Sequence, residues 1–547
     1  MKIAGIWNGH DCSYTVLKDG IPVVHDELER FKREKECAGD AFKLMESNYD
    51  EIEDIQHFAT CYPVNKFTDH KDSFEKIKEI VEKNGGKIYC IPHHQAHAAN
   101  AFYSSNFKES IIITLDGGGV ENENFQTATT IWQGLDNKIE CIHKFPIHQL
   151  NIGGLWTRVT RYVFNLQNGW PRGCQAGSVM AMAAFGDPSK YLEDFRRMLT
   201  IDQVSASHKP ADQPFGANVG TDPEHPYLHK YRVIADSSEQ EKFNLAASLQ
   251  TATEELIKNI IGQVLDQFPS KNLCLSGGVT LNCVAVGKIK KWFPDVENVY
   301  VTPTPHDGGL PIGACQFVWH HELNNSRIDW SDNFKAYLGR TYTLNEVKDT
   351  IKNYSDVEVE EDVSVEKVIE LLAEQNIVSV FGGGSESGRR ALGNRSILAD
   401  PRAENMKDLI NEKVKHRQWY RPFAPSILRE EVSEWFERDD DSPYMNVVMN
   451  FKEDKKSEVP AVVHKDGTAR IQTVTEKDNE WYYNFLKQWK EKSGVPIILN
   501  TSFNDREPIC ETPEHAINCF LGTDIDFLYF YDYNMLLRKT KINKAKK

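Results

Sequence analysis

The sequence predicts an α/β protein with two domains, and three observations lead to this prediction. Apolar stretches of strand length recur along the chain, for example Ile3–Trp7 and Ile111–Leu115. Between such stretches lie segments with helical spacing of apolar residues, the longest from Phe243 to Phe268. The chain has 547 residues, more than one hydrophobic core usually serves. Acidic residues gather from Asp349 to Asp362 ahead of a new strand and helix, so we expect domains of residues 1–345 and 346–547.

Composition narrows the class of protein. The apolar fraction of 40% and the charged fraction of 26% are those of a globular protein, and no apolar run approaches the length of a membrane span. The first residues are too polar for a secretory signal, so we expect a cytoplasmic protein without membrane contact. Cysteines are scattered and form no Cys-x-x-Cys pair, which argues against a disulfide framework. The net charge of -16 disfavours an extended grip on nucleic acid but leaves a local basic groove open.

Two strand-turn-strand units in the first 135 residues resemble each other. The first has a strand at Ile3–Trp7 and the turn Gly9-His10-Asp11 before a second strand, and Lys18-Asp19-Gly20 then has hairpin-turn chemistry. The second has a strand at Ile111–Leu115, a turn at Asp116–Gly119 and another strand. Each turn contains an aspartate. The repetition predicts duplicated α/β halves in the first domain.

A histidine pair is the first candidate for chemistry. Pro92 suits a helix start and the alanines that follow favour helix, so His93 and His97 would project from one face at metal-chelating distance. Hydrogen-bonded histidines without a metal remain an alternative.

Two glycine-rich segments carry aspartates that fit the same kind of site. Asp116 precedes Gly117 and Gly118, which free the backbone to present N–H groups to an anion, although a hairpin capped by the aspartate is an alternative. Asp307 follows His306 in a similar segment. Nitrogen and oxygen ligands suit iron(II), manganese or magnesium better than a metal that prefers thiolates.

A third glycine-rich turn joins a strand to a helix. Ser276, Gly277 and Gly278 follow the apolar stretch at Leu273, and Asn282 lies just beyond. Such a turn presents backbone amides to a nucleotide, although it lacks the Walker pattern and a plain tight turn is an alternative.

The second domain has a different kind of candidate site. Basic residues gather there with glycines, prolines and aromatics, which is unlike an exposed helix face with alternating charges. Guanidinium and ammonium groups together neutralise a phosphate dianion. The sequence therefore predicts a phosphate-binding pocket from Gly388–Ser396 and Lys415–Pro425, completed by Arg470 and Asn500–Asn504.

Seven motifs in one order resemble the NodU/CmcH O-carbamoyltransferases, a family with members in nodulation-factor, cephamycin and aminoglycoside biosynthesis. The motifs are Gly9-His10-Asp11, His93-His94-x-Ala96-His97-Ala98, Leu115–Gly119, Ser276-Gly277-Gly278-Val279, Arg390-Ala391-Leu392-Gly393, Arg421-Pro422-Phe423-Ala424 and Asn500–Asn504. One departure is the loop Gly383–Arg390, which lacks the arginine, methionine and phenylalanine of the family pattern but retains Glu386 and Arg390.

The resemblance implies a fold for each domain and a division of the chemistry. The first domain is expected to be of the actin/sugar-kinase type and to transfer the carbamoyl group. The second is expected to be an α/β domain with a twisted sheet that makes carbamoyl adenylate from carbamoyl phosphate and ATP. The resemblance implies that its pocket for these two substrates is formed by Arg390, Lys415, Arg421, Arg470, Asn500 and Ser502. By carry-over, the metal, most simply iron(II), is held by His93, His97, Asp116 and Asp307. The nucleotide contacts Gly117, Gly118, Ser276, Gly277, Gly278 and Asn282, and the acceptor hydroxyl is deprotonated by His10 beside Asp11.

Several alternatives stay open. An actin-like ATPase or sugar kinase explains the first domain only, and a tRNA threonylcarbamoyladenosine enzyme shares both folds. The acceptor is a small hydroxylated metabolite or a hydroxymethylated nucleobase in a nucleotide or DNA, and a homodimer is not excluded. Aromatics and arginines in Gly153–Tyr162 and Asn168–Gly173 suit stacking on such an acceptor, although an amphipathic helix with a core-facing Trp156 is the alternative.

Overall fold

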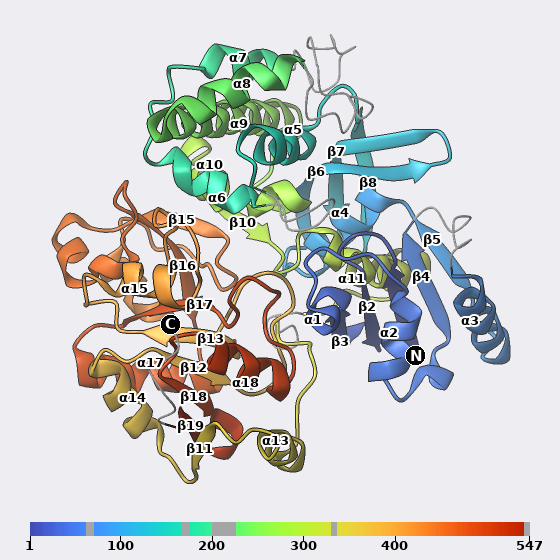
Figure 1. Cartoon of the computed structure of the whole chain (residues 1–547). Coiled ribbons are helices and arrows are strands. Elements are labelled where there is room, and N and C mark those ends of the chain that lie inside the picture. Colours follow the sequence, from blue (N-terminus) through green and yellow to red (C-terminus); the bar gives the residue numbers. More distant parts are fainter. Residues whose placement is uncertain (62–69, 167–174, 200–225, 330–335, 541–547) are drawn as a thin grey trace. The chain divides into compact units, whose positions relative to one another are not determined.

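The computed structural model in Figure 1 shows an α/β protein, as the sequence predicts. The structure describes residues 1–61, 70–166, 175–199, 226–329 and 336–540. The chain divides into two compact units, Met1–Phe334 and Lys335–Lys547. The sequence-based boundary after residue 345 lies inside the second unit. None of the described helices is long and apolar enough to cross a membrane.

The first sheet of unit 1 has five strands in the order β3-β2-β1-β4-β5. Strands β1, β2 and β3 are antiparallel neighbours, and β4 and β5 run parallel to β1. Asp19 and Gly20 have φ angles of 52° and 87°, which confirms the predicted hairpin turn. The strands are β1 (Lys2–Trp7), β2 (Ser13–Lys18), β3 (Ile21–Glu27), β4 (His57–Cys61) and β5 (Ile88–Ile91). The helices α1 (Leu28–Lys32) and α2 (Ala41–Asn48) lie between β3 and β4 in the chain, and α3 (Lys71–Lys83) lies between β4 and β5.

The second sheet of unit 1 has the order β10-β9-β6-β7-β8 and the same pattern of strand directions. Its strands are β6 (Glu109–Asn122), β7 (Phe125–Leu135), β8 (Lys138–Pro146), β9 (Asn272–Ser276) and β10 (Asn298–Val301). The sequence predicts a strand that ends at Leu115, but β6 extends beyond that residue. It continues through the Asp116–Gly119 segment with a shift of register between Leu115 and Gly119, because the glycines accommodate a bulge.

The helices of unit 1 include the two that position the candidate site. Helix α4 (His93–Tyr103) begins directly after Pro92, as predicted, and α11 (Leu310–Phe317) follows a short 3₁₀ turn at Asp307–Gly309. The two helices approach closely, since a Cβ at Gly313 would lie 1.9 Å from the carbonyl oxygen of Ala96. The other helices are α5 (Ile152–Arg158), α6 (Ala176–Ala183), α7 (Leu192–Met198), α8 (Pro226–Ser237), α9 (Glu239–Gln267) and α10 (Cys283–Trp292).

Unit 2 is built on a mixed sheet of nine strands in the order β11-β19-β18-β12-β13-β17-β14-β16-β15. The strands are β11 (Val357–Glu360), β12 (Val378–Phe381), β13 (Arg395–Ala399), β14 (Ala424–Leu428), β15 (Val447–Asn450), β16 (Thr468–Val474), β17 (Ile497–Ser502), β18 (Phe527–Phe530) and β19 (Met535–Lys539). The helices are α13 (Leu344–Ile351), α14 (Val365–Ala373), α15 (Met406–Lys413), α16 (Val432–Trp435), α17 (Glu480–Ser493) and α18 (Pro513–Gly522).

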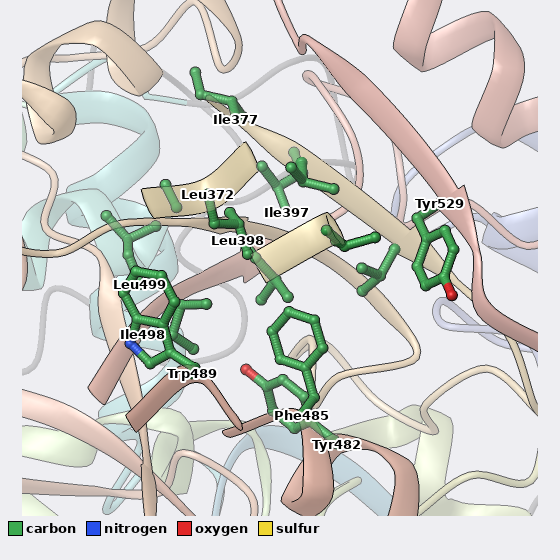
Figure 2. Close-up of a cluster of buried hydrophobic side chains, with 14 of the residues drawn as sticks. Leu372, Ile377, Ile397, Leu398, Tyr482, Phe485, Trp489, Ile498, Leu499 and Tyr529 are labelled. Carbon is green, nitrogen blue, oxygen red and sulfur yellow. The ribbon is translucent and has the colours of Figure 1, made fainter. Parts of the chain in front are cut away.

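Figure 2 shows how this sheet obtains its core. Phe485 and Trp489 are four residues apart on α17, so they lie on one face of that helix. They belong to one buried cluster with Leu372 of α14, Leu398 of β13 and Leu499 of β17. Burying a large apolar side chain of this kind contributes about 1.5–3 kcal/mol, so the cluster fixes the strands that present the polar residues of this unit.

Candidate functional site

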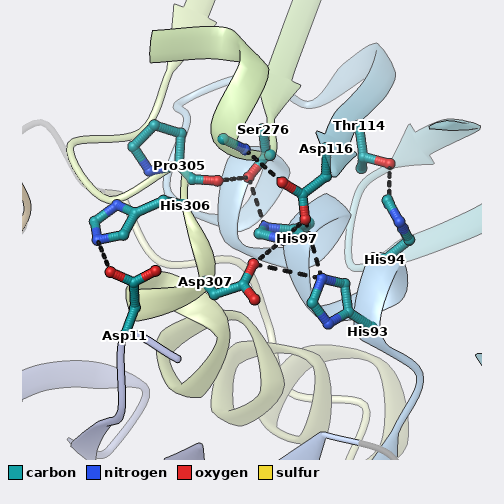
Figure 3. A network of polar contacts seen from close by, with 12 residues as sticks. Asp11, His93, His94, His97, Thr114, Asp116, Ser276, Pro305, His306 and Asp307 are labelled. Atoms are coloured by element: carbon teal, nitrogen blue, oxygen red, sulfur yellow. Dashed lines mark hydrogen bonds and ion pairs between the residues drawn. The ribbon is translucent and has the colours of Figure 1, made fainter. Parts of the chain in front are cut away.

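Four side chains converge in unit 1, as Figure 3 shows. His93 and His97 come from α4, Asp116 from the bulged part of β6, and Asp307 from the turn before α11. His93 Nε2 lies 3.3 Å from Asp116 Oδ2 and 3.5 Å from Asp307 Oδ1, and His97 Nε2 lies 3.6 Å and 3.3 Å from the same two atoms. One potential ligand atom of each residue lies within 4.8 Å of those of the others.

The donor set fits a divalent metal ion. Both histidines and Asp307 are buried, so two carboxylates are brought together away from water. Burial raises the pKa of Asp307, but the charges of His93 and His10 outweigh it and hold that pKa well below its ordinary value. Burial lowers the pKa of His93, but the same carboxylates raise it to about 10. The carboxylates therefore favour positive charge at this place, and a divalent cation would supply it without protons on the histidines.

The ring of His97 is oriented by a residue outside the four. Its Nδ1 lies 3.3 Å from Ser276 Oγ, and that hydroxyl also donates to the carbonyl oxygen of Pro305 at 3.3 Å. Because the single proton of the Ser276 hydroxyl goes to Pro305, its oxygen accepts the hydrogen bond from His97 Nδ1–H. This bond fixes the ring with Nε2 toward Asp116 and Asp307. The backbone N–H of Gly278 donates to Asp116 Oδ1 at 3.0 Å.

His94 points away from the four ligand candidates, as Figure 3 shows. It is buried, and burial together with the charge of His93 lowers its pKa to about 4. Its Nε2 donates to the carbonyl oxygen of Thr127 at 3.0 Å, so its Nδ1 accepts from Thr114 Oγ1 at 2.7 Å. The neutral ring thus ties the start of α4 to β6 and β7.

His10 and Asp11 lie beside the cluster, in the predicted turn between β1 and β2. His10 Nε2 is 3.3 Å from Asp307 Oδ2, and its Nδ1 is 3.0 Å from Asp11 Oδ2. The side chain is 53% exposed, whereas Asp11 is buried. The charge of Asp307 is the main cause that raises the pKa of His10 to about 10. An exposed imidazole at the edge of a buried ligand cluster is well placed to exchange a proton with a substrate.

The residues expected to contact a nucleotide in unit 1 lie near the cluster but have different roles in the fold. Gly277 has φ of 92°, and a Cβ there would lie 2.2 Å from the carbonyl oxygen of Leu115, so the Ser276–Gly278 turn packs directly on β6. Gly117 and Gly118 lie in the β6 bulge. The side chain of Asn282 caps α10 by accepting from Ala285 N and also bonds Gln250.

Lys415 lies in the interior of unit 2, and its ammonium is surrounded by oxygens. It donates to the carbonyl oxygens of Ser502 and Asn504, the latter at 2.9 Å, and to Asn504 Oδ1 at 2.6 Å. Ser502 Oγ lies 3.3 Å away. The lysine therefore fixes the end of β17, where two of the predicted pocket residues stand.

Three arginines of unit 2 gather without carboxylates. Burial and the charge of Arg470 lower the pKa of Arg421 to about 10. Burial, followed by the charges of Arg421 and Arg470, lowers the pKa of Arg417 well below its ordinary value. Within the described part of the chain none of the three forms an ion pair, and Arg470 Nε is buried without a hydrogen-bond partner. A partly buried group of like charges without counterions is what an anion site requires.

Asn500 and the loop of Arg390 complete the region. Asn500 Nδ2 donates to Ala391 O at 3.1 Å and to Gln472 Oε1 at 2.9 Å, whereas its buried Oδ1 has no partner among the described residues. The loop that bears Arg390 is held by Glu386, whose Oε1 accepts backbone N–H groups of Leu392, Asn394 and Arg395 at 2.8–3.0 Å. Arg417 lies in the predicted basic segment but was not among the residues that the resemblance implied for the pocket, although its position near Lys415 could have suggested it.

The segment considered for acceptor stacking is only partly described. Trp156 of α5 is buried, and its Nε1 donates to Thr253 Oγ1 at 2.9 Å, as expected of a core-facing tryptophan. Residues 168–173 lie outside the described residues.

Comparison with known proteins decides the family. The family model described as "Carbamoyltransferase N-terminus" matches residues 69–316, and that described as "Carbamoyltransferase C-terminus" matches residues 369–538. The chain belongs to the carbamoyltransferase family. The predicted resemblance is confirmed, and the protein is a transferase of carbamoyl groups.

Three relatives illustrate the range of this carbamoyltransferase family. The chain is 31% identical to an uncharacterized protein of Synechocystis sp. over 97% of its own length and 95% of the relative's. It is 32% identical to the nodulation protein NolO of Bradyrhizobium diazoefficiens, over 80% and 77% of the two chains. It is 29% identical to the 3'-hydroxymethylcephem-O-carbamoyltransferase of Amycolatopsis lactamdurans, over 74% of each chain.

Proposed function

We propose that this carbamoyltransferase is ATP-dependent and carbamoylates a hydroxyl group, with one half-reaction in each unit. The observation that carries the proposal is the contrast between the two sites. Unit 2 has arginines at 417, 421 and 470 that form no ion pair with any carboxylate of the described residues, which suits anionic substrates. Unit 1 has a buried His/Asp cluster beside an exposed histidine, which suits proton transfer and a bound cation.

In unit 2 we propose the formation of carbamoyl adenylate. Carbamoyl phosphate and water give carbamate and phosphate; a carbamate oxygen then attacks the α-phosphorus of ATP, and pyrophosphate leaves. Both steps bring negatively charged groups of the carbamoyl substrate and ATP close together, and Arg421, Arg470 and Arg390 would offset this charge. The orphan Oδ1 of Asn500 could accept a hydrogen bond from the carbamoyl amide.

In unit 1 we propose transfer from the adenylate to the acceptor. The hydroxyl oxygen attacks the carbamoyl carbon, AMP leaves, and His10 takes the hydroxyl proton. The charge of Asp307 is the main cause that raises the pKa of His10 to about 10, so a cation bound to Asp307 would lower that pKa and leave the ring neutral for this step. His93, His97, Asp116 and Asp307 would hold a divalent metal, which supplies positive charge for a phosphate or carbonyl oxygen when bound. Nitrogen and carboxylate donors suit iron(II) or manganese, and anomalous scattering from nucleotide-bound crystals identifies the ion.

The topology supports the fold expected for this unit. The two five-stranded sheets share strand order and directions, which supports an actin/sugar-kinase type of domain built from duplicated halves. The turns at Gly117–Gly118 and Ser276–Gly278 meet at Asp116, and we propose that a nucleotide phosphate approaches there.

Product analysis tests the proposal. Pyrophosphate release should require both ATP and carbamoyl phosphate, and AMP release should rise when the acceptor is added. ADP formed from ATP without carbamoyl phosphate would instead favour a kinase or ATPase and would contradict the proposal.

The acceptor we propose is a small hydroxylated metabolite or a hydroxymethylated nucleobase in a nucleotide or DNA. Mass spectrometry should find the gain of one carbamoyl unit when these classes are offered in parallel. Transfer to DNA should weaken steeply as salt rises, because the release of counterions that favours binding becomes less favourable at higher salt, whereas transfer to an uncharged metabolite should barely respond. A flat response together with unmodified hydroxymethylated DNA excludes the nucleic-acid acceptor.

A further inference from the structure

A chain of hydrogen bonds runs through the interior of unit 1 and passes through His94, which lies between the two ligand candidates of α4. Trp132 Nε1 donates to Thr130 Oγ1 at 2.6 Å, and that oxygen lies 2.6 Å from Thr114 Oγ1. Thr114 Oγ1 lies 2.7 Å from His94 Nδ1, and His94 Nε2 lies 3.0 Å from the carbonyl oxygen of Thr127. All five residues are buried, so the chain lies away from solvent.

The far end of the chain fixes the direction of every bond in it. The carbonyl oxygen of Thr127 only accepts, so His94 carries its proton on Nε2 and, as a neutral ring, accepts at Nδ1. The Thr114 hydroxyl must then donate to His94, which leaves Thr130 to donate to Thr114. The indole N–H of Trp132, which only donates, bonds the oxygen of Thr130. Each proton therefore has one acceptor, and the imidazole is held in one tautomer and one orientation.

The same chain links the helix of the ligand histidines to the strand of a ligand aspartate. Thr114 lies two residues before Asp116 on β6 and pairs across the sheet with Thr130 of β7. His94 directly follows His93 on α4. The hydrogen bond from Thr114 to His94 therefore joins β6 to the first turn of α4, close to the point where each supplies a ligand.

A second bond from β6 holds the same histidine by its backbone. Glu121 Oε1 accepts from the backbone N–H of His94 at 3.0 Å, and Lys144 of β8 donates to Glu121 Oε2. Pro92, at the N-cap of α4, makes no side-chain hydrogen bond to the first turn, so a carboxylate from the sheet performs the capping. His94 is thus bonded to β6 through both its ring and its backbone.

We propose that His94 is a positioning residue for carbamoyl transfer: the chain sets the place of the two ligand histidines of α4 relative to Asp116. This inference rests on the metal site proposed for unit 1. His94 points away from the four ligand candidates, so it acts through its neighbour His93 (Figure 3). Strand β6 packs directly on the ring of His93, since a Cβ at Gly119 would lie 2.1 Å from His93 Cδ2. Loss of an outer residue that orients metal ligands typically costs about 10–100-fold in metal affinity.

Manganese binding tests this role without a turnover assay. The full-length protein, freed of metal, is titrated with Mn²⁺, and the free ion is measured by electron paramagnetic resonance. Asp116→Asn, which alters a proposed ligand, identifies the part of the binding that belongs to this site. Thr114→Val removes one hydroxyl at nearly constant shape and should lower the affinity of that site at least about tenfold. Thr130→Val should lower it less, because Thr114 can still donate to His94.

Thr129→Val is the matched control. It removes another buried threonine hydroxyl from β7, one that takes no part in the chain, so the affinity for Mn²⁺ should stay at the wild-type value. A conservative pair tests the ring itself. His94→Gln keeps a donor and an acceptor and should retain more affinity than His94→Leu, which keeps neither.

A purely structural role gives a different pattern. Thr114→Val would then have a lower melting temperature, but the folded protein would bind Mn²⁺ with wild-type affinity, and this result would overturn the inference alone. Equal affinities of Thr114→Val and Thr129→Val, or of the two His94 variants, would do the same. Thr130→Val and the His94 pair decide the matter if Thr114→Val does not fold. No Mn²⁺ binding by the wild type, or unchanged binding in Asp116→Asn, would refute the proposed metal site and the inference with it.

Discussion

At the scale of single residues, His10 is distinguished by its exposure. It contacts two carboxylates, Asp11 and Asp307, yet half of its side chain faces solvent. We predict that His10→Asn keeps the melting temperature and nucleotide binding but lowers carbamoyl transfer by about 10²–10⁴-fold, the usual worth of a positioned general base. The exposed His229→Asn is the control and should change neither. A turn-capping role for His10 would instead lower the melting temperature and leave the rate intact.

Arg421 provides the corresponding test in unit 2. It has no ion-pair partner among the described residues, whereas Arg429 is paired with Asp439 and Asp441. We predict that Arg421→Ala loses about 2–4 kcal/mol of transition-state binding in carbamoyl-adenylate formation, measured by pyrophosphate release. Carbamoyl adenylate supplied to the variant should still be used. Arg429→Ala should release pyrophosphate at the normal rate, and equal rates in both variants would refute the assignment.

Some of these residues could be predicted from spacing and others could not. The i,i+4 histidines are a local pattern, and the helix that begins at Pro92 presents both to one site. That Asp116 and Asp307 meet them is a tertiary fact; the glycine-rich segments marked both aspartates as candidates, and the resemblance joined them to the histidines. Arg417 stands in the basic segment two residues after Lys415, which could have suggested it, but its closeness to Arg421 and Arg470 is visible only in the structure.

At the scale of elements, the loop that bears Arg390 depends on one buried carboxylate. Glu386 Oε1 accepts three backbone N–H groups, so its removal leaves buried donors unsatisfied. We predict that Glu386→Ala lowers the free energy of unfolding by at least about 2 kcal/mol in urea titrations. The exposed Glu404→Ala should have no effect. Unchanged stability of Glu386→Ala would show that the loop is held by other contacts.

Element boundaries were harder to predict than element types. The strand at Ile111–Leu115, the helix from Phe243 and the hairpin at Asp19 are all present. The end of β6 was misplaced because three successive glycines usually mark a turn, whereas here they let the strand continue past a bulge. The strand continues because residues beyond the bulge pair with β7. A pattern read from a few neighbouring residues of the sequence does not show this pairing partner.

At the scale of the whole molecule, the proposed division of chemistry between the units predicts a selective effect of metal removal. We predict that chelation, followed by excess Mg²⁺ to serve ATP, abolishes carbamoyl transfer but leaves pyrophosphate release unchanged, because the His/Asp cluster belongs to unit 1. Adding back iron(II) or manganese should restore transfer. Loss of both activities on chelation would contradict this division of labour.

The contact between α4 and α11 has a consequence for the proposed metal site. Gly313 lets one helix rest on the backbone of the other at Ala96, and these helices carry the two histidines and follow Asp307. Because backbone touches backbone, the helices cannot approach further, and we expect a methyl group at Gly313 to push them apart. Such a change would move the histidines relative to Asp307 while all four side chains remain, so the affinity for the proposed ion would depend on a glycine outside the ligand set.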